Sequence, residues 1–375
     1  METICLGGRS AWEAWRVARR TLARQNPPNL LTSLLFLEHP AVDATALPIP
    51  LGPFSPPPHL DVSELRELRA RLDAEGFSAE LDLLASSRAG RTDYGGVNVG
   101  LCSGSYPAGA FFRTAEGLLL PHPGLIAAQL ARSGGASDLD VLKILSEACG
   151  YFVPDDTAPA GLLGCPPLCS VVSLAALFEN IAEYRHARRL RMPAGIARVQ
   201  GLLGLVAERA ASPGEARLTW LLSLPPERGG YGLPWPQLNV LTRLGADGTV
   251  LFGCEDVVCD LTWPERLAMD YQGADVHKPR TRRIGDEEKR ICLQNAGFAC
   301  VQVFKEQLRV LRRMDALASY AASVLGVRGD LFAPELMAAR LALRRDVLAP
   351  WDAGTCGGLP AALTGAGGGT VAGAA

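Results

Sequence analysis

The run of helix and strand signals between Ser212 and Leu325 constrains the fold more than any other feature of the chain. It opens with Ser212-Pro213-Gly214-Glu215, which places Ser at an N-cap, Pro at the first helical position and an acid in the first turn. Short apolar segments separated by turn residues follow and predict strands, and a helix, a strand and a last helix come after them. We therefore expect an α/β fold here, with a mixed sheet flanked by helices.

The expected elements follow from periodicity and turn chemistry. In this part of the chain we predict helices over 212–224, 286–296 and 305–325, and strands over 237–242, 249–254, 257–261, 266–271 and 298–303. Before it we predict helices over 10–25, 61–85, 121–132, 137–148 and 180–209, with short strands within 95–120. Ser10 and Ser137 are the expected N-caps of two of these helices. The six prolines of 47–60 predict an extended connector, because proline lacks the donor that helices and central strands need.

Length and composition suggest how these elements divide into domains. The chain has 375 residues, of which 48% are hydrophobic and 20% are charged, and this excludes wholesale disorder. We expect a mixed α/β domain over 1–195 with a regulatory or positioning role, and a second domain over 196–325. A helical segment over 326–351 follows, and the Gly- and Ala-rich tail over 352–375 is expected to be disordered.

The composition also bears on location. No apolar run approaches the roughly 18 residues that a membrane-spanning helix needs, and the N-terminus does not resemble a signal peptide. The ten cysteines are scattered, and Cys165 and Cys169 lack the matching second pair typical of a zinc site. We therefore expect a cytoplasmic protein with reduced thiols and no membrane partner. The composition does not predict an oligomeric state.

Two acids have a spacing that points to a metal. Asp260 lies at the end of one predicted strand, and Asp270 lies at the end of the next, beyond a Trp-Pro turn. Strands joined in this way bring their terminal carboxylates close together. Neighbouring carboxylates repel unless a cation lies between them, and Mg²⁺ prefers oxygen ligands. Asp260 and Asp270 are therefore the candidate ligands of Mg²⁺ or Mn²⁺.

Three further residues extend this candidate site. Gln272 shares a strand face with Asp270 and can supply a carbonyl oxygen as a third ligand. His277 follows closely enough to handle a proton, and Glu215 lies on the helix that leads into the sheet. Such a set suits metal-assisted hydrolysis of a phosphodiester. Singly, each residue also has a structural interpretation, since strand-end acids cap turns and Glu215 stabilises a helix N-terminus.

The ordered set of these motifs resembles the PD-(D/E)XK nuclease superfamily, and more closely the branch related to very-short-patch repair endonucleases. The matching pieces, in order, are Glu215, Pro236-Gln237, Asp260, Trp263-Pro264-Glu265, Asp270-Tyr271-Gln272-Gly273, His277, Asp286 with Arg290, and the segment 297–303. The resemblance covers about a quarter of the chain. It implies a restriction-endonuclease-like core and a metal-dependent DNA endonuclease of bacterial defence or repair.

The first half of the chain carries a second resemblance. Ser10-Ala11-Trp12-Glu13 and the segment 146–151 are similar to the N-terminal half of bacterial abortive-infection antitoxin-like proteins, which often end in such a nuclease-like domain. The chain departs from the nuclease pattern at two points. Asp270 stands where the family usually has Glu, and the neutral Gln272 stands where it has a second acid. A degenerate fold acting as a DNA-binding regulator of the toxin–antitoxin type is therefore the alternative, and a protein-interaction module is a third.

Charge distribution favours DNA as the partner. The whole chain has a net charge of −2, but residues 276–346 contain 14 Lys and Arg and eight Asp and Glu, a local charge of +6. Basic residues next to the candidate site are expected to contact phosphates. They are Lys278, Arg280, Arg282, Arg283 and Arg290. The structural alternatives are a solvated charged loop and, for Arg290, a helical ion pair with Asp286.

Overall fold

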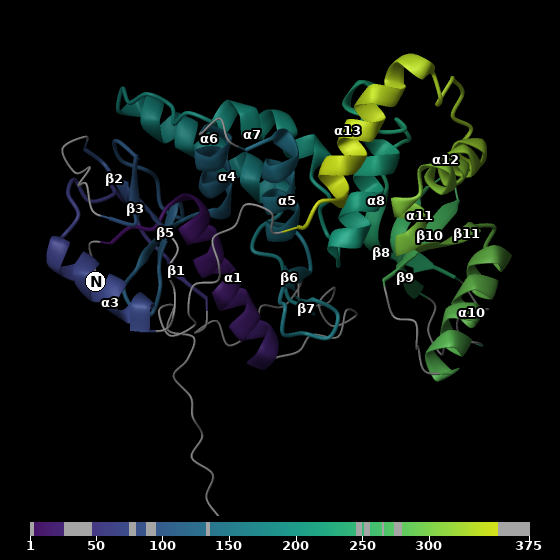
Figure 1. Cartoon of the computed structure of the whole chain (residues 1–375), viewed down its shortest axis with the longest axis horizontal. Coiled ribbons are helices and arrows are strands. Elements are labelled where there is room, and N and C mark those ends of the chain that lie inside the picture. Colours follow the sequence, from purple (N-terminus) through teal and green to yellow (C-terminus); the bar gives the residue numbers. More distant parts are fainter. Residues whose placement is uncertain are drawn as a thin grey trace, which may run out of the picture.

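The computed structural model describes residues 4–25, 47–74, 80–87, 95–132, 136–244, 250, 256–264, 266–273 and 280–351, without the side chains of 280–284. The protein is a mixed α/β structure, as the sequence predicts. Figure 1 shows the N-terminal strands at one end, a group of helices in the middle and the C-terminal sheet at the other end. None of the helices in these ranges is long and apolar enough to cross a membrane.

The N-terminal end is built from short strands. These are β1 (Ile49–Pro50), β2 (Leu81–Ala85), β3 (Val97–Leu101), β4 (Phe111–Arg113) and β5 (Leu119–Pro121). They form a sheet of order β1-β4-β5 and a parallel pair β2-β3. The segment from Ile4 to Leu6 joins the two, because Cys5 bridges Leu119 and Leu6 bridges Leu83. The strands predicted within 95–120 are thus present.

Residues 61–85 do not form the single helix that the sequence predicts. Helix α3 (Val62–Ala74) ends early, and β2 begins at Leu81. The side chains of Leu81, Leu83 and Leu84 are all buried, and β2 pairs with β3 along its whole length. Pairing with a distant strand therefore overrides the local helical pattern.

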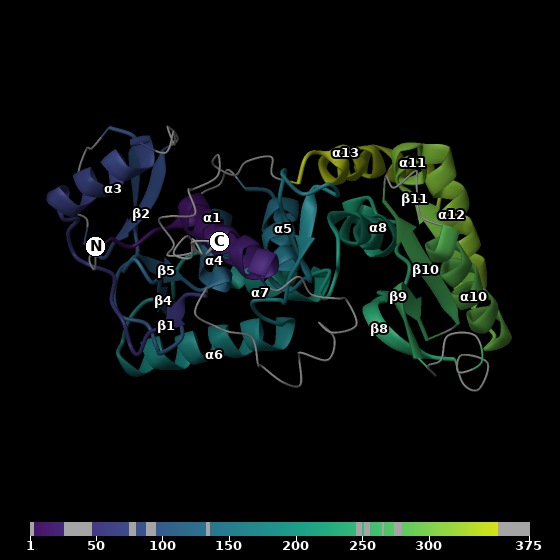
Figure 2. The ribbon, with the colours of Figure 1, turned by 90° about the horizontal axis from the view of Figure 1, so that it is seen from below.

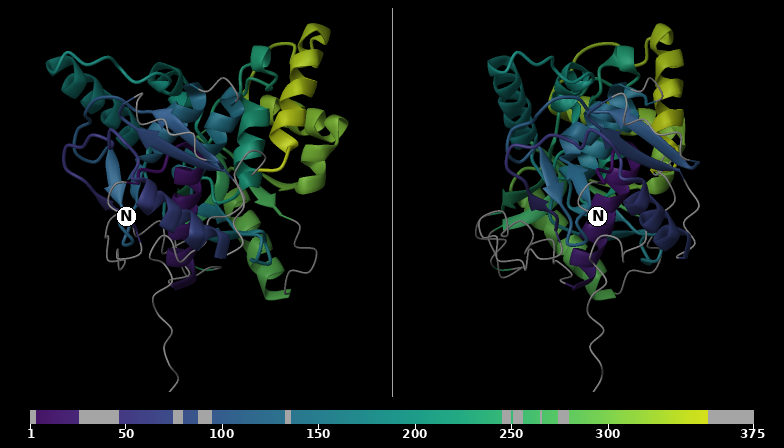
Figure 3. Two further views of the ribbon diagram at one scale, coloured as in Figure 1. Left: turned by 60° about the vertical axis from the view of Figure 1, so that its left-hand side comes forward. Right: turned by 90° about the vertical axis from the view of Figure 1, so that its left-hand side faces the viewer.

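Helices form the middle of the molecule (Figure 1), and Figure 3 shows the same ribbon from two further sides. They are α1 (Gly8–Gln25), α4 (Pro123–Arg132), α5 (Asp138–Ala148), α6 (Val171–Ala187) and α7 (Ile196–Leu202). Ser137 caps α5 through a capping box, as the sequence predicts, but Ser10 does not cap α1, which begins two residues earlier at Gly8. The predicted helix over 180–209 is broken, because α6 ends before Arg188 and Gly195 starts α7 with a φ of +92°. The sequence did not predict the hairpin of β6 (Phe152–Pro154) and β7 (Leu162–Gly164).

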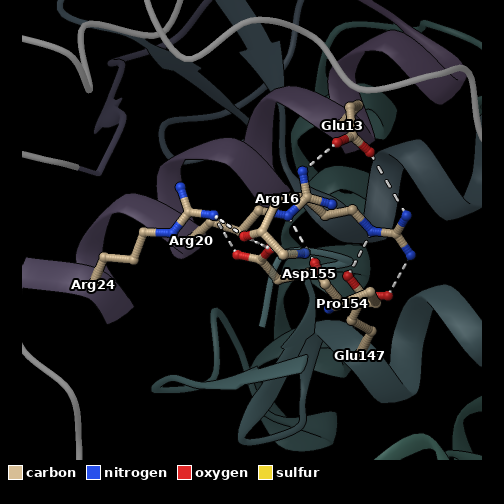
Figure 4. Close-up of polar contacts among 8 residues, drawn as sticks. Glu13, Arg16, Arg20, Arg24, Glu147, Pro154 and Asp155 are labelled. Carbon is tan, nitrogen blue, oxygen red and sulfur yellow. Dashed lines mark hydrogen bonds and ion pairs between the residues drawn. The ribbon is translucent and has the colours of Figure 1, made fainter. Parts of the chain in front are cut away.

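Helix α1 is held in the middle by buried ion pairs. The Arg16 guanidinium donates two hydrogen bonds, of 2.7 and 2.6 Å, to the Glu147 carboxylate on α5 (Figure 4). Arg20 donates to Glu13 at 2.7 Å, and Trp351 donates its indole N–H to Glu147 at 2.9 Å. Glu147 therefore connects the first helix of the chain with Trp351, the last residue that the structure describes.

The C-terminal end is a four-stranded mixed sheet of order β11-β10-β9-β8 (Figure 2). Its strands are β8 (Gln237–Arg243), β9 (Asp256–Trp263), β10 (Leu267–Gln272) and β11 (Ala299–Phe304). Strand β10 is antiparallel to β9 and parallel to β11. The helices that follow or flank the sheet are α8 (Pro213–Ser223), α10 (Arg280–Asn295), α11 (Lys305–Arg309), α12 (Leu311–Leu325) and α13 (Met337–Leu348).

The sheet is covered on both faces. Met269 and Val303 share one core with Trp220 of α8 and Met314 of α12. Ala268 and Cys300 pack on the other side, against Cys292 and Leu293 of α10. The predicted helix over 305–325 is divided in two, because Val310 has extended dihedrals between α11 and α12.

The predicted domain boundary at 195/196 lies within one continuous core. This core contains side chains from both sides of the boundary, with Cys5 as its first member in the sequence and Trp351 as its last. Within it, the rings of Trp351 and Trp220 stack at a centroid distance of 5.8 Å. The division into domains stays a prediction. Helix α13 lies within the predicted segment 326–351. The predicted strand over 249–254 is outside the described residues apart from Val250, and so is the whole predicted tail over 352–375.

Candidate functional site

Strands β9 and β10 place Asp260 beside Asp270. Leu261 pairs with Met269 in the antiparallel ladder, so the two aspartates are neighbours one step further along. The backbone N–H of Asp260 lies 3.4 Å from Oδ1 of Asp270, and the backbone N–H of Tyr271 donates to Oδ2 of Asp260 at 2.6 Å. The structure therefore brings together the two acids that the sequence singles out.

Glu215 joins them from the first turn of α8. Ser212 caps this helix, as the sequence predicts, and its hydroxyl donates to Oε1 of Glu215 at 2.8 Å. A side chain at Gly214 would collide with Tyr271, because a Cβ there would lie 2.0 Å from Cε1 of the ring. The glycine thus lets α8 approach β10 closely enough for the 5% exposed Glu215 to face the aspartates.

Asn239 on β8 is a member of the site that sequence reasoning missed. Its side chain is fully buried and donates to Oε2 of Glu215 at 2.6 Å and to the carbonyl of Arg209 at 2.9 Å. Its φ of +47° is rare for a residue in a strand. Its Oδ1 has no hydrogen-bond partner among the residues that the structure describes. Strain and an orphaned polar atom in one residue are typical of functional sites.

Lys289 on α10 is the second residue that was missed. Its ammonium donates to Oδ1 of Asp270 at 2.7 Å, and its side chain is only 17% exposed. A signal was present, because Lys289 lies one helical turn after Asp286, which belongs to the matched motifs. No lysine follows Asp270 on β10, and the ammonium that contacts Asp270 comes from α10 instead.

The carboxylates of the site repel one another, and this repulsion shifts their pKa values. Burial, together with the nearby Glu215 and Asp270 carboxylates, raises the pKa of Asp260 well above its usual range. Burial also raises the pKa of Glu215. Burial lowers the pKa of Lys289, but the Asp270 carboxylate and other nearby acidic groups raise it more, so the net shift is upward. These groups therefore favour an additional positive charge and keep the Lys289 ammonium protonated.

Of the remaining predicted residues, only Gln272 and Arg290 have side chains that the structure describes. Gln272 lies on β10 two residues after Asp270 and so on the same strand face. Arg290 pairs with the exposed Glu287 on α10. His277 and Lys278 lie outside the described residues. The backbones of Arg280, Arg282 and Arg283 lie in α10, but their side chains are outside the description.

Two neighbouring carboxylates, those of Asp260 and Asp270, are the oxygen donors that this site offers to a metal ion. Apart from the gaps, including 245–249, 251–255 and 274–279, no three His, Cys, Asp or Glu side chains are arranged to hold one. Mg²⁺ needs less than that, since it keeps several waters and is commonly held by one or two carboxylates and substrate phosphates. Asp260 and Asp270 fit this second description. A cavity of about 20 Å³, enough for one water, lies beside Asp270 and is also lined by Asp286 and Arg290.

Comparison with models of known protein families, with curated proteins and with solved structures finds no match. The chemistry of the cluster of Glu215, Asn239, Asp260, Asp270 and Lys289 must therefore be inferred from its own geometry.

Proposed function

We propose that the protein is a Mg²⁺- or Mn²⁺-dependent DNA endonuclease with a PD-(D/E)XK-like core. The observation that carries the proposal is the ammonium of Lys289 at 2.7 Å from Asp270, next to the buried Asp260 and Glu215. Carboxylates that repel one another favour the binding of a cation between them. An ammonium beside them can stabilise the negative charge that develops on a phosphate during hydrolysis.

Each side chain has a role in this proposal. Asp260 and Asp270 would hold the metal ion, with Gln272 as a third oxygen donor. When bound, the ion would polarise the phosphate group of the substrate and lower the pKa of a water molecule bound to it. The Lys289 ammonium has three N–H donors, of which one is given to Asp270, and another would donate to a non-bridging phosphate oxygen, where negative charge develops during hydrolysis. Asn239 and Ser212 orient Glu215 through their hydrogen bonds and so keep the third carboxylate at the edge of the site.

DNA is the proposed substrate because of the charge around the cluster. Residues 276–346 have a local charge of +6, and α10 begins with Arg280, Arg282 and Arg283. Contacts from these residues, and from Lys278, to the phosphate backbone would give binding that is independent of sequence and sensitive to salt. Placement in a bacterial cytoplasm, where DNA is found, is part of the same proposal.

The experiment is a plasmid-nicking assay with Mg²⁺ or Mn²⁺. We expect nicking by the wild type and its loss in Asp260→Asn and Asp270→Asn. We expect a loss of roughly 100-fold in Lys289→Met, the magnitude typical of removing one donor from developing charge. Glu227→Gln is the matched control, because Glu227 is an exposed acid outside the sheet and the cluster. Equal nicking by the wild type and Asp260→Asn would refute the catalytic proposal.

A non-catalytic DNA-binding regulator, of the antitoxin type, is the second candidate. It is favoured by the ion pair of Lys289 with Asp270, which neutralises one carboxylate without a metal, and by the neutral Gln272. Electrophoretic mobility shifts at increasing salt separate the two proposals. DNA binding without nicking would support the regulator, and failure of both would leave the protein-interaction module.

A further inference from the structure

Two thiols lie side by side where α5 ends and α6 begins. Cys149 is the C-cap residue of α5, and Cys169 precedes Ser170, the N-cap of α6. Their sulfur atoms are 3.7 Å apart. Cys149 is buried at 1% exposure, whereas Cys169 is partly exposed. Cys165 is the cysteine nearest to Cys169 in the sequence, whereas the structure places Cys169 beside a cysteine 20 residues away.

The backbone on both sides of this pair is already fixed. The N–H groups of Leu168 and Cys169 both donate to the carbonyl of Ala148, at 2.8 and 3.4 Å. The buried Arg19 of α1 donates to three carbonyls of the same two segments, those of Glu147, Gly150 and Pro166. The two cysteines are therefore held next to each other by contacts that do not involve their sulfur atoms.

We propose that Cys149 and Cys169 form a redox-active dithiol that peroxide oxidises to a disulfide. A disulfide bond is about 2.05 Å long, so each sulfur has to move by roughly 1 Å. Side-chain rotation supplies such a movement, and the clamped backbone can stay in place. The proposal does not depend on the nuclease activity.

The reaction has two balanced steps. The more exposed Cys169, as its thiolate, attacks one peroxide oxygen and becomes a sulfenic acid, and the second oxygen leaves as water. The sulfur of Cys149 then attacks the sulfur of Cys169, forms the disulfide and releases a second water. The two thiols together lose two hydrogens, and the peroxide is reduced. The contact with Cys169 raises the pKa of Cys149, which is consistent with Cys149 keeping its proton until the second step.

The bond would connect α5 to α6 and enclose the β6–β7 hairpin in a covalent loop. Glu147, which receives hydrogen bonds from both Arg16 and Trp351, lies two residues before Cys149. The oxidised protein should therefore resist denaturation in this central region more than the reduced protein does.

The test treats the reduced full-length protein with hydrogen peroxide, alkylates the remaining thiols and maps the peptides by mass spectrometry. We expect the thiol count to fall from ten to eight. We also expect an intact mass lower by about 2 Da and a linked peptide pair containing Cys149 and Cys169, with reversal by a thiol reductant. Cys300→Ala, at another partly exposed cysteine, should retain the link.

Cys149→Ala and Cys169→Ser should each abolish the link. Because Cys169 is partly exposed, its substitution keeps the test valid even if the buried Cys149→Ala variant fails to fold. Ten thiols persisting after peroxide would overturn the proposal. A link between other cysteines, or sulfinic acid on Cys169 with Cys149 still free, would overturn it equally.

Discussion

Replacing Arg16 by Met would leave the Glu147 carboxylate charged inside the protein. The side chains of the pair are 3% and 0% exposed, and their closest N···O distance is 2.6 Å. Two unit charges about 4 Å apart attract by about 4 kcal/mol at an effective dielectric constant of about 20. Breaking a buried pair by removing one partner typically costs about 3–5 kcal/mol. We expect the free energy of unfolding to fall by that amount at pH 8.

The pH dependence and a double variant give two further signatures. Burial raises the pKa of Glu13, which also pairs with Arg16 at 3.6 Å, and removal of Arg16 should raise it further, so Glu13 binds a proton more readily in the folded state and the loss is smaller at pH 5 than at pH 8. Arg16→Met combined with Glu147→Gln should be more stable than Arg16→Met alone. The amide oxygen of the glutamine can still accept the indole N–H of Trp351, no Glu147 carboxylate is left without its cation, and Glu13 keeps its pair with Arg20.

Urea denaturation followed by tryptophan fluorescence and by circular dichroism measures these differences, provided that the two probes give coincident transitions. Arg24→Met is the matched control on the same helix. Arg24 pairs with Asp155 at 2.6 Å, but the Arg24 side chain is 54% exposed, and the 3% exposed Asp155 side chain keeps its hydrogen bonds from the N–H and the hydroxyl of Thr157, so removal of Arg24 should cost less than removal of Arg16. A loss below 1 kcal/mol for Arg16→Met, or the same loss at both pH values, would refute the reasoning.

Two further predictions concern a histidine and a glycine. Burial lowers the pKa of His122 to about 4. In the unfolded chain it binds a proton below about pH 6.5, so the free energy of unfolding should fall as the pH drops through the window between these values. The expected decrease in the free energy of unfolding from pH 7 to pH 5 is about 2 kcal/mol. Denaturation of His122→Asn at both pH values should show a decrease smaller by this amount. The same pH dependence in the variant and the wild type would contradict a lowered pKa of His122. Gly214→Ala would place a Cβ 2.0 Å from the Tyr271 ring and should cost about 1–3 kcal/mol by forcing α8 away from β10. Gly285→Ala, whose Cβ would meet nothing within 4 Å on helix α10, should instead raise thermal stability by about 0.5–1 kcal/mol, and equal effects of the two substitutions would argue against the close approach.

Local chemistry in the sequence determined where several helices begin and which strands exist. Ser137 and Ser212 cap α5 and α8 because an N-cap depends only on residues within one helical turn. The alternation and turn residues after Pro236 likewise predicted β8, β9, β10 and β11, and the adjacency of Asp260 and Asp270 followed from the short turn between their strands.

Only the tertiary structure decided the features that depend on distant parts of the chain. Residues 81–85 became a strand because β3 was available to pair with them. Lys289 and Asn239 reached the carboxylate cluster from α10 and β8, and Cys149 met Cys169 across the β6–β7 hairpin. The physical reason is the same in each case. A contact between residues far apart in sequence is set by the packing of whole elements, which no short window of the sequence contains.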